Sequence, residues 1–329
     1  MRLSVARRVA PLLAEQHGVI TSSQLRTAGV DLEVPRREGW VRLAVGLWAV
    51  GPPNDEQLLT ALGLYAPGAL ASGAIACRWH GLQYPPAQVG CHAVAPHGTT
   101  LLGGPLLTVH QTRRMPAAEV VVDRPVVPVA RAVADAARWT TSLQEARAVV
   151  LAALHRRRTT AVALEAEQRA GAVRDAARLR RALVDWHRGA CSAPEAEAAD
   201  ALLALAGSAP PFLLNPEVRL DGVLLGIPDG WIPSAGIGWE MDSVEHHASR
   251  DDLDVTLLRH QRFSDAGLVL RHVTPSRFRR DSRAWATDLV ARARAQGLAG
   301  WRPPHGLVLV PRGPLLGGRS VITGLQAAA

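Results

Sequence analysis

The sequence predicts a multidomain protein of the α/β class, built from α+β domains. Its 329 residues suffice for two or three domains of about 100–200 residues each. The start of the chain carries helical patterns followed by two short strand patterns, and a later region alternates between strands and helices. We therefore expect an N-terminal domain over residues 1–52, a mixed, mainly helical linking domain over 53–190, a C-terminal α/β domain over 191–300, and a flexible tail over 301–329.

Composition points to an anionic partner. The chain has a formal net charge of +8, and its 37 basic residues are all arginine. Guanidinium groups suit phosphates and guanine edges, so the excess charge favours nucleic acid, although a general bias toward Ala, Arg, Val and Gly contributes to it. Three scattered cysteines fit a reducing compartment. No apolar run reaches the roughly 20 residues that span a bilayer, so we expect a cytoplasmic protein with no membrane partner.

The first domain has the element order of a winged helix-turn-helix. Apolar residues recur at helical spacing before Gly18. Thr21 and Gln24 then form a capping box for a second helix. In order, the expected elements are a helix ending near Gly18, a short helix stopped by Gly29, a third short element over 32–38, and two strands over 40–50.

Two stretches of this domain, Ile20–Leu25 and Val45–Trp48, carry a family resemblance. They resemble the N-terminal winged-helix domain of AbiEi-type antitoxins of type IV toxin–antitoxin systems. The resemblance implies DNA binding, with Arg36, Arg37 and Arg42 near phosphates or base edges, and it implies a cognate toxin as a partner. The alternative is a small helical domain with ordinary surface arginines.

The middle of the chain carries no catalytic cluster. Cys77, His80, Cys91 and His92 lack the C-x-x-C or H-x₃-H spacing of a zinc site, so we expect buried cysteines and hydrogen-bonded histidines. Arginines of its later helices form either solvated surface or an auxiliary DNA contact. The expected elements are helices over 58–65, 69–79, 125–139, 143–155, 161–170 and 173–186, and strands over 91–95, 106–110 and 120–122.

The C-terminal domain opens with a second capping box, made by Ser192 and Glu195. Strand and helix patterns follow in the order α-β-β-β-α-β-α. The expected elements after the first helix are strands over 212–215, 218–220 and 224–227, a central strand over 237–242, a helix over 251–266, a buried strand over 268–273, and a closing helix over 276–293.

Three carboxylates gather around the central strand. Strand side chains alternate between faces, so Glu240 and Asp242 lie on the same face, and Asp229 follows a proline just upstream. Converging carboxylates repel one another unless a cation lies between them. Oxygen-rich sites of this kind suit Mg²⁺ or Mn²⁺, which activate water and stabilise the charge of a phosphodiester under attack.

A longer motif runs through this domain: Pro228-Asp229, Glu240-Met241-Asp242, His246-His247 and an arginine-bearing helix. It resembles the PD-(D/E)XK nuclease superfamily, and most closely the domains related to very-short-patch-repair (Vsr) endonucleases. The resemblance implies a restriction-endonuclease-like core. It also implies metal ligation by Asp229 and Glu240, general-base catalysis by His246 or His247, orientation of metal-bound water by Glu195, and phosphate binding by Arg259.

The superfamily's lysine is missing from this motif. Asp242 occupies its place, and no other lysine exists in the chain. A carboxylate binds metal but does not stabilise an oxyanion as an ammonium does, so an arginine or the histidines must fill that role. Structural alternatives remain: Glu195 only caps its helix, His246 and His247 lie on a surface loop, and Asp242 pairs with Arg271 or Arg259.

These patterns support two functional hypotheses. The first is a DNA-binding protein whose endonuclease-like domain hydrolyses DNA phosphodiesters with Mg²⁺ or Mn²⁺. The alternative is an AbiEi-like antitoxin or transcriptional regulator whose nuclease fold is catalytically degenerate.

Overall fold

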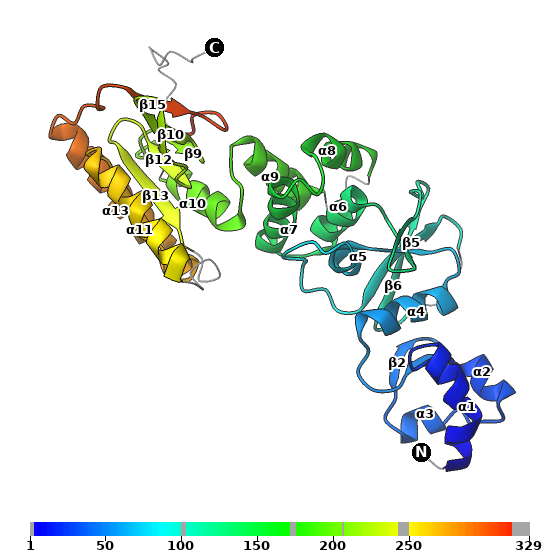
Figure 1. Ribbon diagram of the computed structural model, residues 1–329. Coiled ribbons are helices and arrows are strands. Elements are labelled where there is room, and N and C mark those ends of the chain that lie inside the picture. The colour runs from blue at the N-terminus through cyan, green and yellow to red at the C-terminus, as the bar shows by residue number, and fades with distance from the viewer. Residues whose placement is uncertain (1–2, 100–102, 172–175, 206, 243–249, 318–329) are drawn as a thin grey trace. The chain divides into compact units, whose positions relative to one another are not determined.

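The computed structural model describes residues 3–99, 103–171, 176–205, 207–242 and 250–317. Its helices and sheets confirm the expected mixed α/β class (Figure 1). The chain divides into two compact units, Met1–Arg180 and Arg181–Ala329, which we call unit 1 and unit 2. Within the described ranges, no helix is both long enough and apolar enough to cross a membrane.

Unit 1 begins with three helices and a three-stranded sheet in the order β1-β3-β2. The elements are α1 (Leu3–Glu15), β1 (Val19–Thr21), α2 (Ser22–Thr27), α3 (Val34–Arg37), β2 (Val41–Ala44) and β3 (Leu47–Ala49). The predicted capping box is confirmed, because the Gln24 N–H donates to Thr21 Oγ1 and the Thr21 N–H donates to Gln24 Oε1. Helix α3 has four residues, so the third element is a single turn. Val9, Ile20, Leu25 and Trp48 form part of the core beneath these elements.

The rest of unit 1 is built on a five-stranded sheet in the order β6-β5-β4-β8-β7. The elements are α4 (Asp55–Tyr65), β4 (Leu70–Ser72), α5 (Gly73–Trp79), β5 (Cys91–Pro96), β6 (Leu107–Thr112), β7 (Glu119–Val121), β8 (Arg124–Val126), α6 (Val129–Trp139), α7 (Leu143–His155) and α8 (Ala161–Ala170). Helix α9 (Ala177–His187) contains the boundary between the units. The helix predicted over 125–139 was wrong at its start: Ala71 of β4 pairs with Val126, a long-range partner that local periodicity does not reveal.

Several buried polar groups in unit 1 are paired as expected for a structural core. Cys77 and Cys91 are buried, and His80 Nε2 lies 2.8 Å from the Val127 carbonyl oxygen. These contacts fit the expectation of buried cysteines and hydrogen-bonded histidines. In addition, the fully buried Asp135 accepts a 2.6 Å hydrogen bond from Arg131. This pair lies within α6 and stabilises it against the sheet, because Ser72 of β4 donates to the same carboxylate at 2.8 Å.

Unit 2 contains two sheets, of order β14-β13-β12-β9 and β11-β10-β15. The elements are α10 (Ala193–Leu203), β9 (Leu213–Leu214), β10 (Glu217–Leu220), β11 (Val223–Gly226), β12 (Gly230–Ile232), β13 (Ile237–Met241), α11 (Arg250–Asp265), β14 (Val269–Val273), α12 (Pro275–Arg280), α13 (Ser282–Leu298) and β15 (Leu307–Val310). The single closing helix predicted over 276–293 is two helices. Asp281 separates them, and its side chain caps α13 by accepting from the Ala284 N–H at 2.8 Å.

Helices cover both faces of the four-stranded sheet. On one face, Trp231 of β12 packs against Phe263 of α11, with ring centroids 5.8 Å apart. On the other face, Trp239 of β13 packs edge-on against Phe212 and against Trp285 of α13. The strand β13 is therefore buried along its whole length, which makes any charged side chain on it costly unless it is paired.

The C-terminal segment is part of unit 2 rather than a free tail as far as Gly317. Strand β15 pairs antiparallel with β10, from Glu217 opposite Val310 to Leu220 opposite Leu307. Phe212 and Leu316 then form a bridge in which each N–H donates to the other residue's carbonyl at 2.8 Å. The flexible tail predicted over 301–329 is therefore wrong for this part. The glycines and prolines of this segment suggested an irregular tail, and its pairing partners lie about ninety residues upstream.

Candidate functional site

The candidate site lies where the parallel strands β13 and β14 end. The two strands pair in a register that places Glu240 beside His272. His272 Nδ1 lies 2.8 Å from Asp242 Oδ2 and 3.9 Å from Glu240 Oε2. One ligand atom from each of these three side chains lies within 4.8 Å of the others. Because carboxylate oxygen and imidazole nitrogen are both metal donors, the cluster has the chemistry of a cation site.

A cation from the protein already touches this cluster. Arg259 of α11 donates from Nη2 to Glu240 Oε2 at 2.5 Å. Glu240 is 4% exposed, so this is a buried ion pair. Among the described residues, Glu240 Oε1 and Arg259 Nε are buried without a hydrogen-bond partner. An orphaned buried carboxylate oxygen is unusual, because most buried polar atoms are paired. Glu240 Oε1 therefore has capacity for one more positive partner.

Two further carboxylates lie near this cluster, Asp229 immediately before β12 and Glu195 on α10. Asp229 accepts from the Met241 N–H through Oδ2 at 2.6 Å. Its carbonyl oxygen accepts from the Asn215 N–H at 3.2 Å. The Asn215 side chain in turn donates to Glu195 Oε2 at 2.5 Å, and the Cys191 N–H donates to the same oxygen at 2.7 Å. Asn215 thus links the start of α10 to the strand that carries Asp229.

Burial and mutual repulsion disfavour the ionised forms of these carboxyls. Burial is the main cause that raises the pKa of Glu195, of Asp229 and of Glu240. The charges of Glu195 and Glu240 raise the pKa of Asp229 further. The hydrogen bond between His272 and the Asp242 carboxylate, which favours the protonated imidazole, raises the pKa of His272. A bound cation would stabilise the ionised carboxylates that this arrangement otherwise disfavours.

The structure brings several predicted residues together and redefines their contacts. Asp229, Glu240 and Asp242 lie on adjacent strand ends, and Arg259 contacts Glu240. The structural alternative that Asp242 pairs with Arg271 or Arg259 was wrong: Asp242 contacts His272, and Arg271 lies 3.5 Å from Asp288 instead.

Glu195 has a structural position, as one sequence alternative foresaw. Ser192 Oγ accepts from the Glu195 N–H at 3.4 Å, which confirms Ser192 as the N-cap of α10. The capping box itself differs from the expected one. Its glutamate accepts from the N–H of Cys191 at 2.7 Å and from the hydroxyl of Ser192 at 2.7 Å, rather than from the N–H of Ser192.

The remaining predicted residues lie elsewhere. His246 and His247 fall outside the described residues. Arg36, Arg37 and Arg42 are exposed in unit 1, where Arg36 forms a 3.4 Å ion pair with Glu33.

Sequence reasoning missed His272. The signal was present in β14, where strand alternation places Leu270 and His272 on the same face. The parallel register with β13 is needed to see that this face is the one that carries Glu240.

Comparisons with known proteins give little further information. No family model matches the chain, and no curated protein matches it. Among solved structures, it is similar to the crystal structure of the RV2827C protein from Mycobacterium tuberculosis, with 19% sequence identity and a TM-score of 0.36 over 55% of this chain and 76% of that chain. Similarity at this level does not establish a common fold.

Proposed function

We propose that unit 2 is a metal-dependent nuclease domain of the PD-(D/E)XK type that hydrolyses DNA phosphodiesters. The observation that carries the proposal is the cluster of Glu240, Asp242 and His272 at the ends of β13 and β14. Asp229 lies on the adjacent strand and repels Glu240. Buried carboxylates are costly unless they are paired or metal-bound, so a function that requires a cation accounts for their presence together.

The donor set fits a hard divalent cation such as Mg²⁺ or Mn²⁺. Glu240 and Asp242 would hold it, with Asp229 as a further oxygen donor from the neighbouring strand. The buried and unpartnered Glu240 Oε1 supports this assignment. When bound, the cation would activate water and neutralise charge on the phosphodiester.

The protein's own cations take the place of the missing lysine. Arg259 contacts Glu240 through Nη2, and its side chain is 34% exposed, so its guanidinium has capacity to bind a phosphate oxygen as well. His272 holds Asp242 through a 2.8 Å hydrogen bond. His272 would position this carboxylate, and its imidazole would lie, together with the guanidinium of Arg259, beside the reacting phosphate.

Unit 1 would supply DNA binding through a winged helix. The order of α1, α2 and α3 followed by the β2–β3 hairpin supports this assignment. Arg36 and Arg37 lie exposed on α3, and Arg42 is exposed on β2. Because α3 is a single turn, these side chains would contact the backbone phosphates more than base edges, and they would position the chain on DNA.

The test is cleavage by the full chain and by Glu240→Gln, with Glu217→Gln as the matched control. Glu217 is a partly buried carboxylate of β10 that pairs with Arg219 at 2.8 Å, outside the site. We expect Glu240→Gln to lower Mg²⁺- or Mn²⁺-dependent cleavage of duplex DNA at least about 100-fold, because several kcal/mol of transition-state stabilisation depend on the cation. Glu217→Gln should cleave normally.

Two results together would refute both the nuclease activity and the metal site. The first is a wild-type chain that leaves single-stranded, duplex and nicked DNA intact with either metal. The second is Mn²⁺ binding that is unchanged by Asp229→Ala and by Glu240→Gln in calorimetry. If only cleavage is absent, the metal site stands and the catalytic assignment fails.

The second candidate is a transcriptional regulator or AbiEi-like antitoxin with a degenerate nuclease fold and a cognate toxin partner. The Arg259–Glu240 pair favours it, since a guanidinium that neutralises the buried carboxylate lets the fold exist without a metal. This candidate predicts promoter binding that persists in Glu240→Gln and falls when Arg36, Arg37 and Arg42 are changed to alanine. Unchanged promoter occupancy in that triple variant would exclude it.

A further inference from the structure

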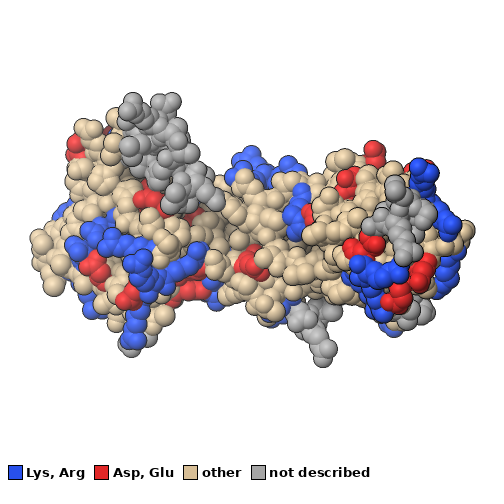
Figure 2. Space-filling view, turned by 90° about the horizontal axis from the view of Figure 1, so that it is seen from below, with Lys and Arg blue, Asp and Glu red and all other residues tan. Residues whose placement is uncertain are grey.

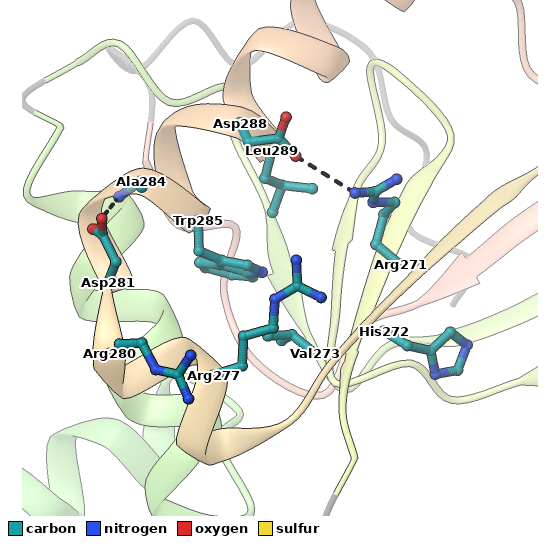
Figure 3. A pocket seen from close by; sticks show the side chains of 10 residues that line it. All are labelled: Arg271, His272, Val273, Arg277, Arg280, Asp281, Ala284, Trp285, Asp288 and Leu289. Carbon is teal, nitrogen blue, oxygen red and sulfur yellow. Dashed lines mark hydrogen bonds and ion pairs between the residues drawn. The ribbon is translucent and has the colours of Figure 1, made fainter.

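A pocket of about 370 Å³ lies beside the candidate site, at the outer edge of the four-stranded sheet (Figure 3). Strand β14 forms one wall, and the helices α12 and α13 form the other. Arginines project into it from two elements, Arg271 from β14 and Arg277 and Arg280 from α12. His272 also lines the pocket, but its ring points away from the arginines (Figure 3), because it lies beside Glu240 whereas Arg271 lies beside Trp239 on the other face of the sheet.

The positive charge of this pocket is only partly compensated. Its two acidic residues, Asp281 and Asp288, are both engaged: Asp281 caps α13, while Asp288 accepts from Arg292 at 2.8 Å and lies 3.5 Å from Arg271. Arg277 and Arg280 form no ion pair with any residue that the structure describes.

Arg279 of the same helix behaves differently, because it pairs with Glu197 at 2.9 Å. The two unpaired guanidinium groups therefore belong to the pocket side of α12. Figure 2 shows basic side chains gathered on unit 2, at the left of the view, with acidic groups between them.

We infer that this pocket binds a backbone phosphate of the DNA strand, next to the phosphate that reaches the carboxylate cluster. Guanidinium groups bind phosphate through paired hydrogen bonds in a planar fork. Two unpaired arginines on one helix turn, with Arg271 opposite them, present such forks to one space. The inference rests on the proposed function, because the pocket would hold the DNA strand that the carboxylate cluster hydrolyses.

The position of β14 at the edge of the sheet gives a DNA strand access to the pocket. An edge strand leaves its outer side uncovered by a further strand, so a strand of nucleic acid can pass around the edge of β14, from the pocket on the α13 face to the cluster on the α11 face. Phosphate contacts of this kind fix register and add affinity without reading sequence. The pocket would therefore determine how the DNA lies on unit 2. The carboxylate cluster would determine which phosphodiester bond is hydrolysed.

The test measures DNA binding by the full chain without divalent metal, so that cleavage plays no part. We expect Arg277→Ala/Arg280→Ala to bind duplex DNA about tenfold more weakly near physiological salt. Its slope of log affinity against log salt should be smaller by about 2, since two phosphate contacts are lost. Arg277→Lys/Arg280→Lys should keep most of the slope, because lysine retains the charge, and lose part of the affinity, because it lacks the fork.

Arg302→Ala is the matched control. Arg302 is exposed, and it donates a 3.4 Å hydrogen bond to the neighbouring Trp301 carbonyl. It follows the far end of α13, a helix of 17 residues or roughly 25 Å at 1.5 Å per residue. We expect its affinity and salt slope to match those of the wild type. Inorganic phosphate is a separate arm: its binding in calorimetry should weaken in the Arg277→Ala/Arg280→Ala chain, and millimolar phosphate should compete with DNA.

The outcomes separate this inference from the proposed function. Equal affinity and equal salt slope for the wild type and Arg277→Ala/Arg280→Ala overturn the pocket, whatever the cleavage result. A wild type that never cleaves DNA but loses affinity in the double variant refutes the nuclease and supports the pocket. Phosphate binding that depends on the two arginines, combined with DNA affinity that does not, assigns the pocket to free phosphate and overturns the strand contact.

Discussion

Gly230 shows how closely the site depends on packing at a single residue. It directly follows Asp229 and lies opposite Trp239 in the β12–β13 pairing. A Cβ atom added at Gly230 would lie 1.9 Å from the Trp239 ring, which is fully buried. The absence of a side chain at this position therefore lets β12 approach β13 and brings Asp229 within reach of the Met241 N–H.

We expect Gly230→Ala to destabilise unit 2 by about 3 kcal/mol, the upper end of the usual cost of overpacking a core. Gly297→Ala is the matched control, because a Cβ atom at this exposed position in α13 would meet nothing within 4 Å. It should stabilise unit 2 by about 0.5 kcal/mol through lower chain entropy in the unfolded state. Urea unfolding followed by circular dichroism measures both changes. Equal stability of the two variants would contradict the packing argument.

His110 offers a pH-dependent prediction in unit 1. Its ring stacks on Trp139 with centroids 3.9 Å apart, and its Nε2 lies 3.2 Å from His92 Nδ1. Burial, together with the charges of His92 and Arg131, lowers the pKa of His110 from 6.5 to about 4. The folded state therefore binds fewer protons here than the unfolded state does between these pH values.

The stability contributed by neutral His110 should be complete above about pH 6.5 and should be lost as the pH falls to about 4. The loss amounts to at most about 3 kcal/mol. Comparing thermal unfolding of the wild type and His110→Phe from pH 7.5 to 4 tests this, since phenylalanine keeps the stacking but does not titrate. The wild type should lose more stability than the variant across this range. Parallel pH profiles would show that His110 does not carry the effect.

At the residue scale, the sequence predicted the local part of the site. Asp229, Glu240 and Asp242 lie within fourteen residues of one another in the chain, so strand alternation was enough to group them. His272 lies thirty residues after Asp242, and only the parallel register of β13 and β14 brings it to the cluster. Arg259 was expected to hold a phosphate, whereas the structure pairs it with Glu240.

Among the elements, β15 differs most from its expected state. It completes the three-stranded sheet, and Leu309 packs against the core of Val218, Trp231 and Phe263. Local patterns predicted most helices within a few residues. They did not predict the partner of β15 or the start of β8, because both depend on pairing between segments far apart in the chain.

We expect Leu309→Asp to destabilise unit 2 by about 2–3 kcal/mol, because it buries a carboxylate without a partner. Val308→Asp is the matched control on the same strand, since Val308 is 45% exposed and its substitution should change stability by about 0.5 kcal/mol or less. Hydrogen exchange of peptides that cover β10 and β15 measures the difference. If both variants exchange as slowly as the wild type, β15 does not contribute to the core.

At the scale of the whole molecule, the chain consists of two units with separate cores. The proposed metal ligands all belong to unit 2, and the proposed winged helix belongs to unit 1. Length and motif spacing predicted more than one domain. They placed the boundary near residue 190, close to the observed one, because α9 continues a helical pattern across it without a break in composition.

Metal binding should therefore stabilise only one unit. With Mn²⁺ at about 100 times its dissociation constant, we expect unit 2 to gain about 2.7 kcal/mol, seen as slower hydrogen exchange in peptides of β13, β14 and α11. Peptides of unit 1 should exchange at unchanged rates, and the Glu240→Gln chain should show no gain in either unit. Equal protection of both units would contradict a metal site confined to unit 2.

The pairing of Arg259 with Glu240 has a consequence for how this protein responds to metal supply. In many small metalloproteins the ion is part of the fold, and a chelator unfolds them. Here a guanidinium already balances the buried carboxylate, so we expect the chain to fold without a metal and to survive EDTA intact. An incoming ion would share Glu240 with that arginine, because Glu240 Oε1 has no hydrogen-bond partner among the described residues. The site would then report cellular metal through its activity, with the amount of folded protein held constant.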